Sequence, residues 1–425
     1  MKNIVAGTAA RYAPLESRRD EMSRCVRCGA CSALCPPFLE KREETFSARG
    51  RMALIKAVLD RRLSVSDIFK DRLATCTGCL ACEVSCPSRV PVTEIIQAAK
   101  EQAVRESGLG IINAVLSGVL KSDRALRSFA WLAPVVLHYG RRPFNKTGKA
   151  HFPPGPGNTF LHTVSKDILL HAKKRAGTTR GRVAFFSGCA ANYVQQYIAH
   201  ASVSALLRLG FDVVVPGDQK CCGRPLLSLG DRRSAEELAS RNSAVLAKAG
   251  ADAIVTACAS CGLTFKKEYP KLLPSGVRSP VVLDIHELLS EGLEGRELAP
   301  FNTSVTYHDP CHLGRGQGLS ETARNILRSI PGLSLIEMRN ADRCCGFGGV
   351  MRITHRELST AIAEGKAKDI ISTGAPVVAT GCPGCRMQIT DALRRAGSDV
   401  EVLHTVQIVE AAMNKEDEKT ASSLS

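Results

Sequence analysis

The 425-residue chain is poor in aromatic residues and has no long apolar run. Aromatics make up 5% of it, and tryptophan occurs once. The most apolar stretch, at 129–139, is only eleven residues long and contains a proline, whereas a spanning helix needs about 18 or more consecutive apolar residues. The first 22 residues show no apolar segment before a cleavage site, as a secretory signal would. We expect a cytoplasmic protein, with peripheral attachment at the inner face of the cytoplasmic membrane left open.

Negative charge is scarce in the first part of the chain. Residues 1–182 carry 31 Lys and Arg against 15 Asp and Glu, whereas 183–425 carry 26 of each. Such an excess suits an acidic partner, an anionic membrane surface or nucleic acid. Basic groups such as Arg141, Arg142 and Lys173 are not interleaved with aromatics, which a nucleic-acid site would favour. We therefore predict a docking face for a partner or membrane and no nucleic-acid partner.

Cysteine is abundant, at 18 residues, while 44% apolar and 23% charged residues exclude disordered and collagen-like classes. A reducing cytoplasm disfavours disulfides, so this number of thiols indicates metal binding. Every cysteine falls into one of four groups: Cys25, Cys28, Cys31, Cys35; Cys76, Cys79, Cys82, Cys86; Cys189, Cys221, Cys222, Cys258, Cys261; and Cys311, Cys344, Cys345, Cys382, Cys385.

The last two groups are copies of one another. Their matching cysteines are offset by 122 to 124 residues, as for Cys189 and Cys311, which indicates an internal duplication. Each copy alternates short β-branched runs with helical patterns, which is typical of a parallel α/β sheet. The N-terminal part instead shows helical spacing, for example at 48–60 and 93–106.

These patterns predict a multidomain chain with an α-helical N-terminal domain and two duplicated βαβ modules. The expected divisions are a helical domain at 1–137, a Pro-, Gly- and base-rich linker at 138–182 around a helix at 161–175, a first module at 183–300, a second module at 301–413 and a disordered tail at 414–425.

The first two cysteine groups match the CxxCxxCxxxCP run of two-cluster ferredoxins, including Pro36 and Pro87. In such runs three thiolates bind one [4Fe-4S] cubane, and the fourth reaches the other cluster. This predicts two cubanes, one held by Cys25, Cys28, Cys31 and Cys86 and the other by Cys76, Cys79, Cys82 and Cys35. Zinc is the alternative, but its sites favour two separated CxxC pairs.

Each later group has the pattern Cys, then CCG, then CxxC. If Cys189 and Cys258 follow parallel strands, as Cys311 and Cys382 do in the second copy, the sulfurs converge at one sheet edge. Five thiols exceed the needs of zinc or an ordinary cubane, so we predict one or two further, noncubane clusters. Structural zinc and a metal-free redox dithiol remain alternatives. The glycines of CCG, Gly223 and Gly346, suit close approach of the backbone to a cluster.

The whole arrangement, over about residues 20–410, resembles the cysteine-rich CCG family of iron–sulfur proteins. SARGRMALIK (47–56), YHDPCHLGRGQG (307–318) and CCGFGG (344–349) are similar to glycolate oxidase and lactate dehydrogenase iron–sulfur subunits. VAFFSGCAANY (183–193) and KEYP (267–270) resemble the CCG-containing electron carrier of anaerobic glycerol-3-phosphate dehydrogenase. The order of motifs also resembles the CCG-containing subunit of heterodisulfide reductase. In the reductases the resemblance implies noncubane [4Fe-4S] clusters in the CCG modules, and this chain keeps all ten cysteines of them.

The resemblance implies an electron carrier in an oxidoreductase complex. We expect an iron–sulfur subunit of a flavin-dependent 2-hydroxyacid dehydrogenase of the glycolate or D-lactate type. An FAD-containing partner subunit would supply electrons, and a quinone- or membrane-linked partner would take them. The alternatives are a disulfide reductase acting at a CCG cluster and a glycerol-3-phosphate dehydrogenase-like carrier, so no catalytic residue is assigned. His308, Asp309 and His312 flank Cys311, and we interpret them as hydrogen-bonded neighbours of the thiols rather than as ligands. GRGQG (314–318) lacks the GxGxxG spacing of a dinucleotide loop.

Overall fold

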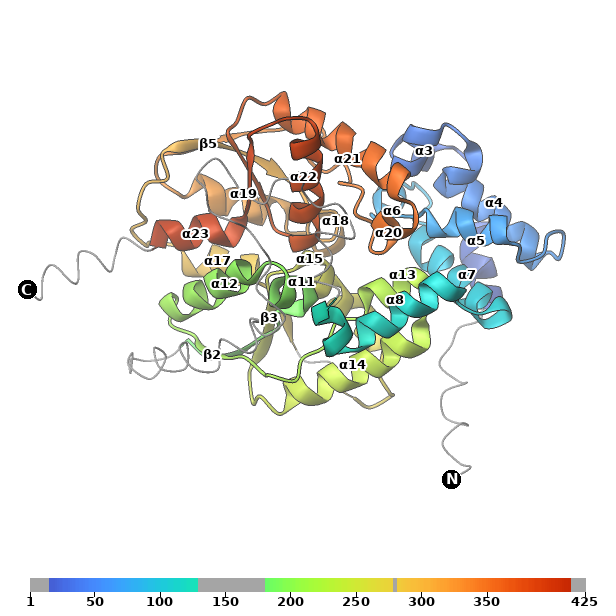
Figure 1. Ribbon diagram of the computed structural model, residues 1–425, viewed down its shortest axis with the longest axis horizontal. Helices are drawn as coiled ribbons and strands as arrows, with labels where there is room; N and C mark the ends of the chain where they lie inside the picture. Colours follow the sequence, from blue (N-terminus) through green and yellow to red (C-terminus); the bar gives the residue numbers. More distant parts are fainter. Residues whose placement is uncertain (1–14, 129–179, 278–280, 414–425) are drawn as a thin grey trace, which may run out of the picture. The chain divides into compact units, whose positions relative to one another are not determined.

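The computed structural model describes residues 15–128, 180–277 and 281–413 (Figure 1). Most of the predicted linker, its helix at 161–175, the apolar stretch at 129–139 and the predicted tail lie outside the described residues. Within the described part, the prediction of a helical N-terminal region followed by two parallel α/β modules is confirmed.

The described N-terminal region consists of helices. They are η2 (Leu15–Arg18), α1 (Arg19–Ser23), α2 (Ala30–Ala33), α3 (Pro36–Lys41), η3 (Glu44–Phe46), α4 (Ala48–Leu59), α5 (Asp67–Ala74), α6 (Ala81–Val84), α7 (Val92–Ser107) and α8 (Ile111–Lys121). The Ser47 hydroxyl caps α4 by accepting a hydrogen bond from the Gly50 backbone N–H. A side chain at Gly50 would overlap the Glu44 carbonyl, at 1.9 Å from the Cβ position, so glycine lets η3 pack closely on α4.

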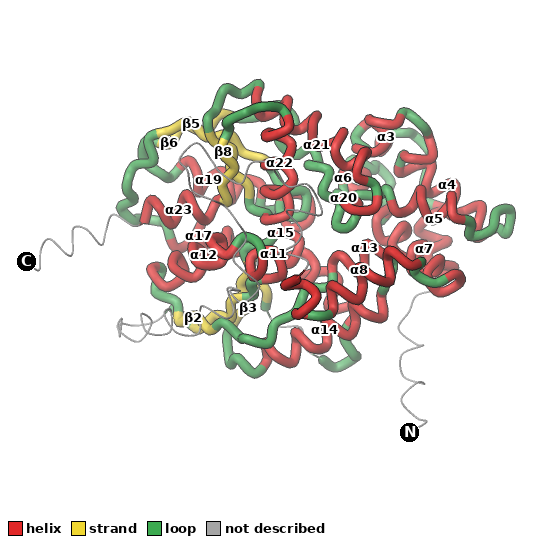
Figure 2. The backbone as a smooth tube through the Cα atoms, viewed as in Figure 1, coloured by secondary structure: helices red, strands yellow, loops and turns green. Residues whose placement is uncertain are grey.

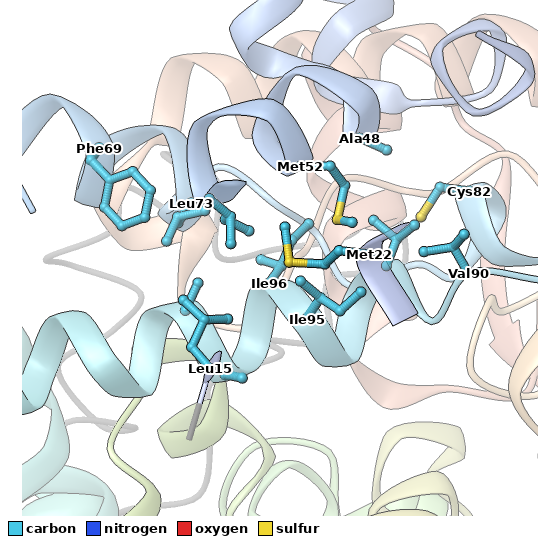
Figure 3. Close-up of a cluster of buried hydrophobic side chains, with 14 residues drawn as sticks. Leu15, Met22, Ala48, Met52, Phe69, Leu73, Cys82, Val90, Ile95 and Ile96 are labelled. Carbon is cyan, nitrogen blue, oxygen red and sulfur yellow. The ribbon is translucent and has the colours of Figure 1, made fainter. Parts of the chain in front are cut away.

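One apolar core joins these helices (Figure 3). Ile55 of α4 and Ile95 of α7 are fully buried in it, and Cys82 is 9% exposed. Half-buried thiols from both cysteine runs, including Cys25 and Cys76, pack against the same core. The loops that carry the two runs are therefore anchored on one set of apolar side chains.

The first module is built on a four-stranded parallel sheet of order β2-β1-β3-β4. Its elements are β1 (Arg182–Phe185), α11 (Gly188–Tyr193), α12 (Gln196–Arg208), β2 (Asp212–Val214), α13 (Arg224–Leu229), α14 (Arg232–Ala247), β3 (Ala253–Thr256), α15 (Ala259–Leu263), the π-helical turn η4 (Thr264–Glu268), α16 (Tyr269–Leu272), β4 (Val282–Asp284) and α17 (Ile285–Gly292). Because the chain leaves β1 first to one side and then to the other, a crevice opens at the carboxyl ends of β1 and β3.

The second module repeats this topology as β6-β5-β7-β8 (Figure 2). Its elements are β5 (Thr303–His308), α18 (Gly314–Gln317), α19 (Ser320–Arg328), β6 (Leu333–Ile336), α20 (Met351–Thr354), α21 (Arg356–Ile371), β7 (Val377–Thr380), α22 (Pro383–Arg395), β8 (Glu401–His404) and α23 (Thr405–Met413). The register is also repeated, since Val183 pairs with Ala253 in one sheet and Val305 with Val377 in the other. The duplication predicted from cysteine spacing therefore extends to strand pairing.

The two modules pack on each other through equivalent helices. The helix after the first strand of each module contacts the helix after the fourth strand of the other, so α12 packs on α23 and α17 on α19. The short helices behave in the same way, with α11 on α22 and α15 on α18. Such reciprocal contacts are the signature of a two-fold arrangement, here within one chain.

The chain divides into two compact units that are not continuous in sequence. One unit holds residues 1–117 together with 223–236 and 346–362, and the other holds the remainder. In each module the chain enters the first unit directly after the paired cysteines, at Gly223 and Gly346. The boundaries predicted at 137, 182, 300 and 413 stay predictions.

The two inserted segments pack on the N-terminal helices within the first unit. Lys100 of α7 donates a hydrogen bond to the Ser228 carbonyl at 3.1 Å. His355 lies 3.0 Å from an Asp71 carboxylate oxygen. Phe46 forms a small buried cluster with side chains of the second segment, namely Met351, Leu358 and Ile362.

Among the described residues, no single helix has both the length and the apolar character of a membrane span. Taken together, α7 and α8 meet that test, but they are bent by 110° at the break between them.

Candidate metal centres

All eighteen cysteines lie in the described part of the chain, and each is a free thiol. In the N-terminal region, Cys35 from the first run lies among cysteines of the second run. Burial raises the pKa of the Cys35 thiol, and the nearby Cys79 and Cys76 raise it further. Burial likewise raises the pKa of Cys82, with additional contributions from Cys76, Cys79 and Cys35. The structure thus gathers the four thiols predicted for the second cubane.

A buried guanidinium faces this second group. Arg51 is 1% exposed, and its Nη1 lies 3.7 Å from the Cys35 sulfur. Its other hydrogen bonds go to the neutral oxygens of Arg72 and Thr75, both at 2.7 Å. A buried cation needs an anionic partner, and a thiolate-ligated iron–sulfur cluster carries net negative charge. The surroundings of this thiol group therefore fit an anionic cluster.

The first run is placed more openly. Cys28 is exposed, whereas Cys25, Cys31 and Cys86 are half-buried against the common core. Burial raises the pKa of Cys31, to which Cys25 and Cys35 also contribute. The Cys86 sulfur accepts a hydrogen bond from the Val90 backbone N–H at 3.4 Å. Its predicted place in the first cubane stays a prediction.

In the first module, the five cysteines converge from distant parts of the sequence at the carboxyl edge of the sheet. Cys189 follows β1, Cys258 follows β3, and the Cys221–Cys222 pair follows β2. Hydrogen-bonding contacts with Cys189 and then Cys222, together with burial, raise the pKa of Cys221 well above its usual range. Contacts with Cys222 and Cys258, and burial, raise that of Cys261 in the same way.

The second module repeats this arrangement. The sulfurs of Cys345 and Cys385 lie 3.5 Å apart. Contacts with Cys345 and then Cys382, together with burial, raise the pKa of Cys385. Four of the five cysteines are buried, and Cys311 is half-buried. Crowded buried thiols of raised pKa become thiolates only when a cation binds them, so both groups fit multinuclear metal binding.

The two groups approach each other where the modules meet. Cys258 and Cys382, which occupy equivalent positions, are close enough to exchange a hydrogen bond, and the contact with Cys258 is the main reason that the pKa of Cys382 is lowered. Ser260 bridges the modules, because its hydroxyl lies 2.9 Å from His312 Nδ1 and 3.9 Å from the Cys382 sulfur. Cysteine spacing gives no indication of this approach.

Two equivalent glutamines support the meeting point. Gln195 Nε2 donates to the Pro383 carbonyl at 2.9 Å, and Gln317 Nε2 donates to the Ala259 carbonyl at 3.1 Å. Each acceptor directly follows the first cysteine of the CxxC pair in the opposite module. Gln317 belongs to the GRGQG segment, and a side chain at Gly316 would lie 2.9 Å from Leu263 of the other module. The segment is therefore a packing motif between the modules.

The paired cysteines are held from behind by buried polar side chains that pattern analysis missed. Asn242 of α14 accepts from the Lys220 backbone N–H at 2.8 Å and donates to the Cys221 carbonyl at 3.0 Å. In the second module Lys366 of α21 donates to the carbonyls of Asn340 and Ala341, at 2.6 and 3.3 Å. Both side chains lie on long amphipathic helices, where single polar residues give no distinctive signal.

The CCG glycines have a role different from the predicted approach to a cluster. Both adopt left-handed backbone conformations, with φ of +89° at Gly223 and +84° at Gly346. A Cβ at Gly346 would lie 2.7 Å from the Ser359 carbonyl, and one at Gly223 would lie 3.6 Å from Ala235. The side that lacks a side chain therefore faces the next helix, and glycine permits the turn that follows the thiols.

The residues around Cys311 behave in three ways. Asp309 is buried and forms an ion pair with Arg324 at 3.1 Å, and His312 contacts Ser260, so the interpretation of hydrogen-bonded neighbours fits these two. His308 is 1% exposed, and neither ring nitrogen has a hydrogen-bond partner among the described residues. Burial lowers its pKa to about 3, so the ring is neutral.

Comparison with known proteins agrees with these sites. The profile of the 4Fe-4S dicluster domain matches residues 21–90, and that of the cysteine-rich domain matches 183–266 and 305–390. The chain is 31% identical to an iron–sulfur relative from the fumarate reductase (CoM/CoB) of Methanothermobacter marburgensis, over 91% of this chain and 72% of that protein. It is 30% identical to the "Probable glycolate oxidase iron-sulfur subunit" of Bacillus subtilis, over 93% and 95%.

A third relative has a name of a different class. It is a component of the dihydromethanophenazine:CoB–CoM heterodisulfide reductase of Methanosarcina barkeri, 29% identical over 92% of this chain and 94% of that protein. The domain matches and the gathered thiols support several iron–sulfur clusters in this chain. With two relatives at 30% identity or above matched over most of their lengths, the chain belongs to the family of iron–sulfur proteins that join a 4Fe-4S dicluster domain to two cysteine-rich CCG domains.

Proposed function

We propose that this protein is the electron-transferring subunit of a flavin-dependent 2-hydroxyacid dehydrogenase of the glycolate or D-lactate type. One observation carries the proposal: all eighteen thiols gather into cluster-sized groups, in a chain similar over nearly its whole length to a glycolate oxidase iron–sulfur subunit. Oxidation of a 2-hydroxyacid to a 2-oxoacid releases two electrons and two protons. An FAD-containing partner would take both electrons, and this chain would pass them singly towards a quinone or similar acceptor.

The residues of the chain serve this role by holding clusters in fixed, mostly dry surroundings. Iron–sulfur clusters supply one-electron storage, with potentials set by burial, charge and hydrogen bonds. Arg51 beside Cys35 favours the reduced, more negative state of the second cubane. The contact between Cys258 and Cys382 brings the two CCG sites together, so that an electron moves between them over a short distance.

A disulfide reductase is the second candidate, and a specific observation favours it. Both modules keep all five cysteines, and the two sets meet at one surface between the modules. Reduction of a disulfide consumes two electrons and two protons and yields two thiols, and two adjacent one-electron sites would supply the electrons. The heterodisulfide reductase relative adds support for this candidate.

Anaerobic co-purification followed by substrate-dependent reduction tests the choice. The chain would be expressed with the flavoprotein genes of its own source, isolated anaerobically and analysed for iron and zinc. Bleaching of the cluster absorption by glycolate or D-lactate, dependent on the flavoprotein, is the expected result. Turnover with disulfides and none with 2-hydroxyacids would transfer the assignment to the second candidate. Stoichiometric zinc with negligible iron would contradict both.

We further propose that the basic first part of the chain docks on an acidic partner or on the inner face of the cytoplasmic membrane. Residues 1–182 carry the whole positive excess. Electrostatic association weakens as salt rises, because the Debye length falls from about 10 Å at 0.1 M to about 3 Å at 1 M. Binding to the flavoprotein and to anionic vesicles, each followed across salt, separates the two surfaces. Binding that is insensitive to salt in both assays would contradict the proposal.

A further inference from the structure

The imidazole of His308 lies against the thiols of the second module. One of its ring nitrogens and the sulfurs of Cys345 and Cys385 all lie within 4.8 Å of one another, and all three residues are buried. The histidine is the last residue of β5, so the strand fixes its direction towards the carboxyl edge where the thiols converge. The fold therefore aims this ring into the predicted cluster site.

The ring is unsatisfied without a group in that site. A neutral imidazole has one N–H donor and one acceptor nitrogen, and neither finds a partner among the described residues. Buried polar groups are nearly always paired, and an orphaned N–H is the rarer and more costly exception. His308 is thus a donor, buried beside two thiols, whose partner is expected inside the cluster site.

The first module shows that the fold does not require histidine at this position. Three residues before the first cysteine of each module stand Phe186 and His308 respectively. Phe186 packs edge-on against Phe265, with ring centroids 4.8 Å apart and planes at 77°. An apolar ring therefore fills the position well in one module, while the other places a polar ring there that has no hydrogen-bond partner among the described residues.

We propose that His308 donates its ring N–H to the sulfur of the cluster bound in the second module, and that this contact raises the cluster's reduction potential above that of the first module. A hydrogen bond to cluster or cysteine sulfur stabilises the reduced state, which carries more negative charge. Donation is favoured over iron ligation because five thiols already supply the ligands, and an unpaired acceptor nitrogen costs less than an unpaired N–H. Electrons shared between the two modules would then settle in the second.

The inference rests on the cluster-binding part of the proposed function and does not depend on the flavoprotein. It is tested by EPR-monitored redox titration of the whole chain with chemical mediators, so failure of the proposed partner leaves the result intact. The variants are the reciprocal swaps His308→Phe and Phe186→His, together with His308→Gln, which keeps an N–H donor. Cys222→Ser and Cys345→Ser assign each signal to its module.

His308→Phe should lower the reduced-to-oxidised ratio of the second-module cluster about tenfold at a fixed potential, which equals about 59 mV for one electron. Phe186→His should raise the first-module ratio, and His308→Gln should restore much of the loss. Loss of the second-module cluster in His308→Phe with retention in His308→Gln also supports donation.

Several results would overturn the proposal. They are unchanged midpoints in both swaps, loss of the cluster in both His308 variants, a strong directly bound nitrogen coupling in pulsed EPR, and absence of a second-module cluster from the wild-type protein. The last of these would also remove that cluster site from the proposed function. Reduction by mediators without reduction by the flavoprotein would instead contradict only the electron-transfer assignment.

Discussion

The N-terminal and C-terminal cysteine sites solve the same problem in opposite ways. In the N-terminal region each run places four thiols within eleven residues, at 25–35 and 76–86, on loops that pack against one small core. In the modules the five thiols of a site are spread over 189–261 or 311–385 and meet only because parallel strands end at one edge. The first kind of site depends on loop conformation, whereas the second depends on a sheet that has its own apolar core.

Removal of iron should therefore separate the two regions more than any other change. Anaerobic chelation is expected to disorder the loops at 25–35 and 76–86, because metal binding is coupled to their folding and Arg51 would lose its anionic partner. The sheets should persist, since buried strand residues such as Val305 and Tyr307 do not depend on metal. Hydrogen exchange followed by mass spectrometry would show this difference. Equal loss of protection in both regions would break the comparison.

Substitution of one convergent thiol should act on one module alone. Cys345→Ser and Cys222→Ser are each expected to abolish the cluster signal of their own module, with a loss of about four irons for a [4Fe-4S] cluster. The N-terminal cubane signals should remain, because their ligands lie on other loops. Iron analysis and EPR of the anaerobic variants give the measurement. Retention of the full set of signals in both variants would mean that the CCG cysteines are not ligands.

The N-terminal core itself offers a test of intermediate size. Ile95→Ala removes a fully buried side chain from the core that supports both runs, and such truncations cost about 2–5 kcal/mol. Ile112→Ala on α8, where the side chain is 67% exposed, is the matched control and should change stability by about 0.5 kcal/mol or less. Anaerobic thermal unfolding measures both variants. A similar shift in both would show that this core does not stabilise the loops.

The smallest effect is expected at the reciprocal glutamines. Gln195→Ala and Gln317→Ala each remove one hydrogen bond between the modules, at a cost of about 0.5–1.5 kcal/mol. Because the two bonds support the same meeting point of Cys258 and Cys382, the double variant should deviate from additivity by about 0.5 kcal/mol or more. Denaturation midpoints of the two single variants and the double variant complete the cycle. Strict additivity would mean that the two contacts act independently.

Local patterns were sufficient for much of the fold but not for its long-range features. The strands beginning at Val183 and Val305 were expected, and parallel pairing followed from their alternation with helices. The fourth strands, β4 and β8, were not identified, because they are three and four residues long and only pairing with β3 or β7 distinguishes them from loops. Short strands of this kind depend on tertiary context more than on local propensity.

The sites show the same division between local and long-range information. Cysteine spacing was enough to sort the thiols into groups, since ligand patterns are written in the local sequence. It did not indicate the approach of Cys258 to Cys382, which depends on how two folded modules pack. It also missed Arg51 and Asn242, whose roles come from what surrounds them after folding. His308 was noticed beside Cys311, but its lack of a partner among the described residues emerges only in three dimensions.

The passage of the chain into the first unit after each cysteine pair affects how the protein matures during synthesis. The N-terminal helices emerge from the ribosome early, but the segments that complete their unit, at 223–236 and 346–362, follow much later. At a translation rate of about 5–20 residues per second, the last of these appears about 12–50 seconds after residue 117. During that interval the surfaces around Phe46 and Asp71 lack their final partners, Met351 and His355. Cluster insertion into the N-terminal loops therefore has a window of access that closes only when synthesis is nearly complete.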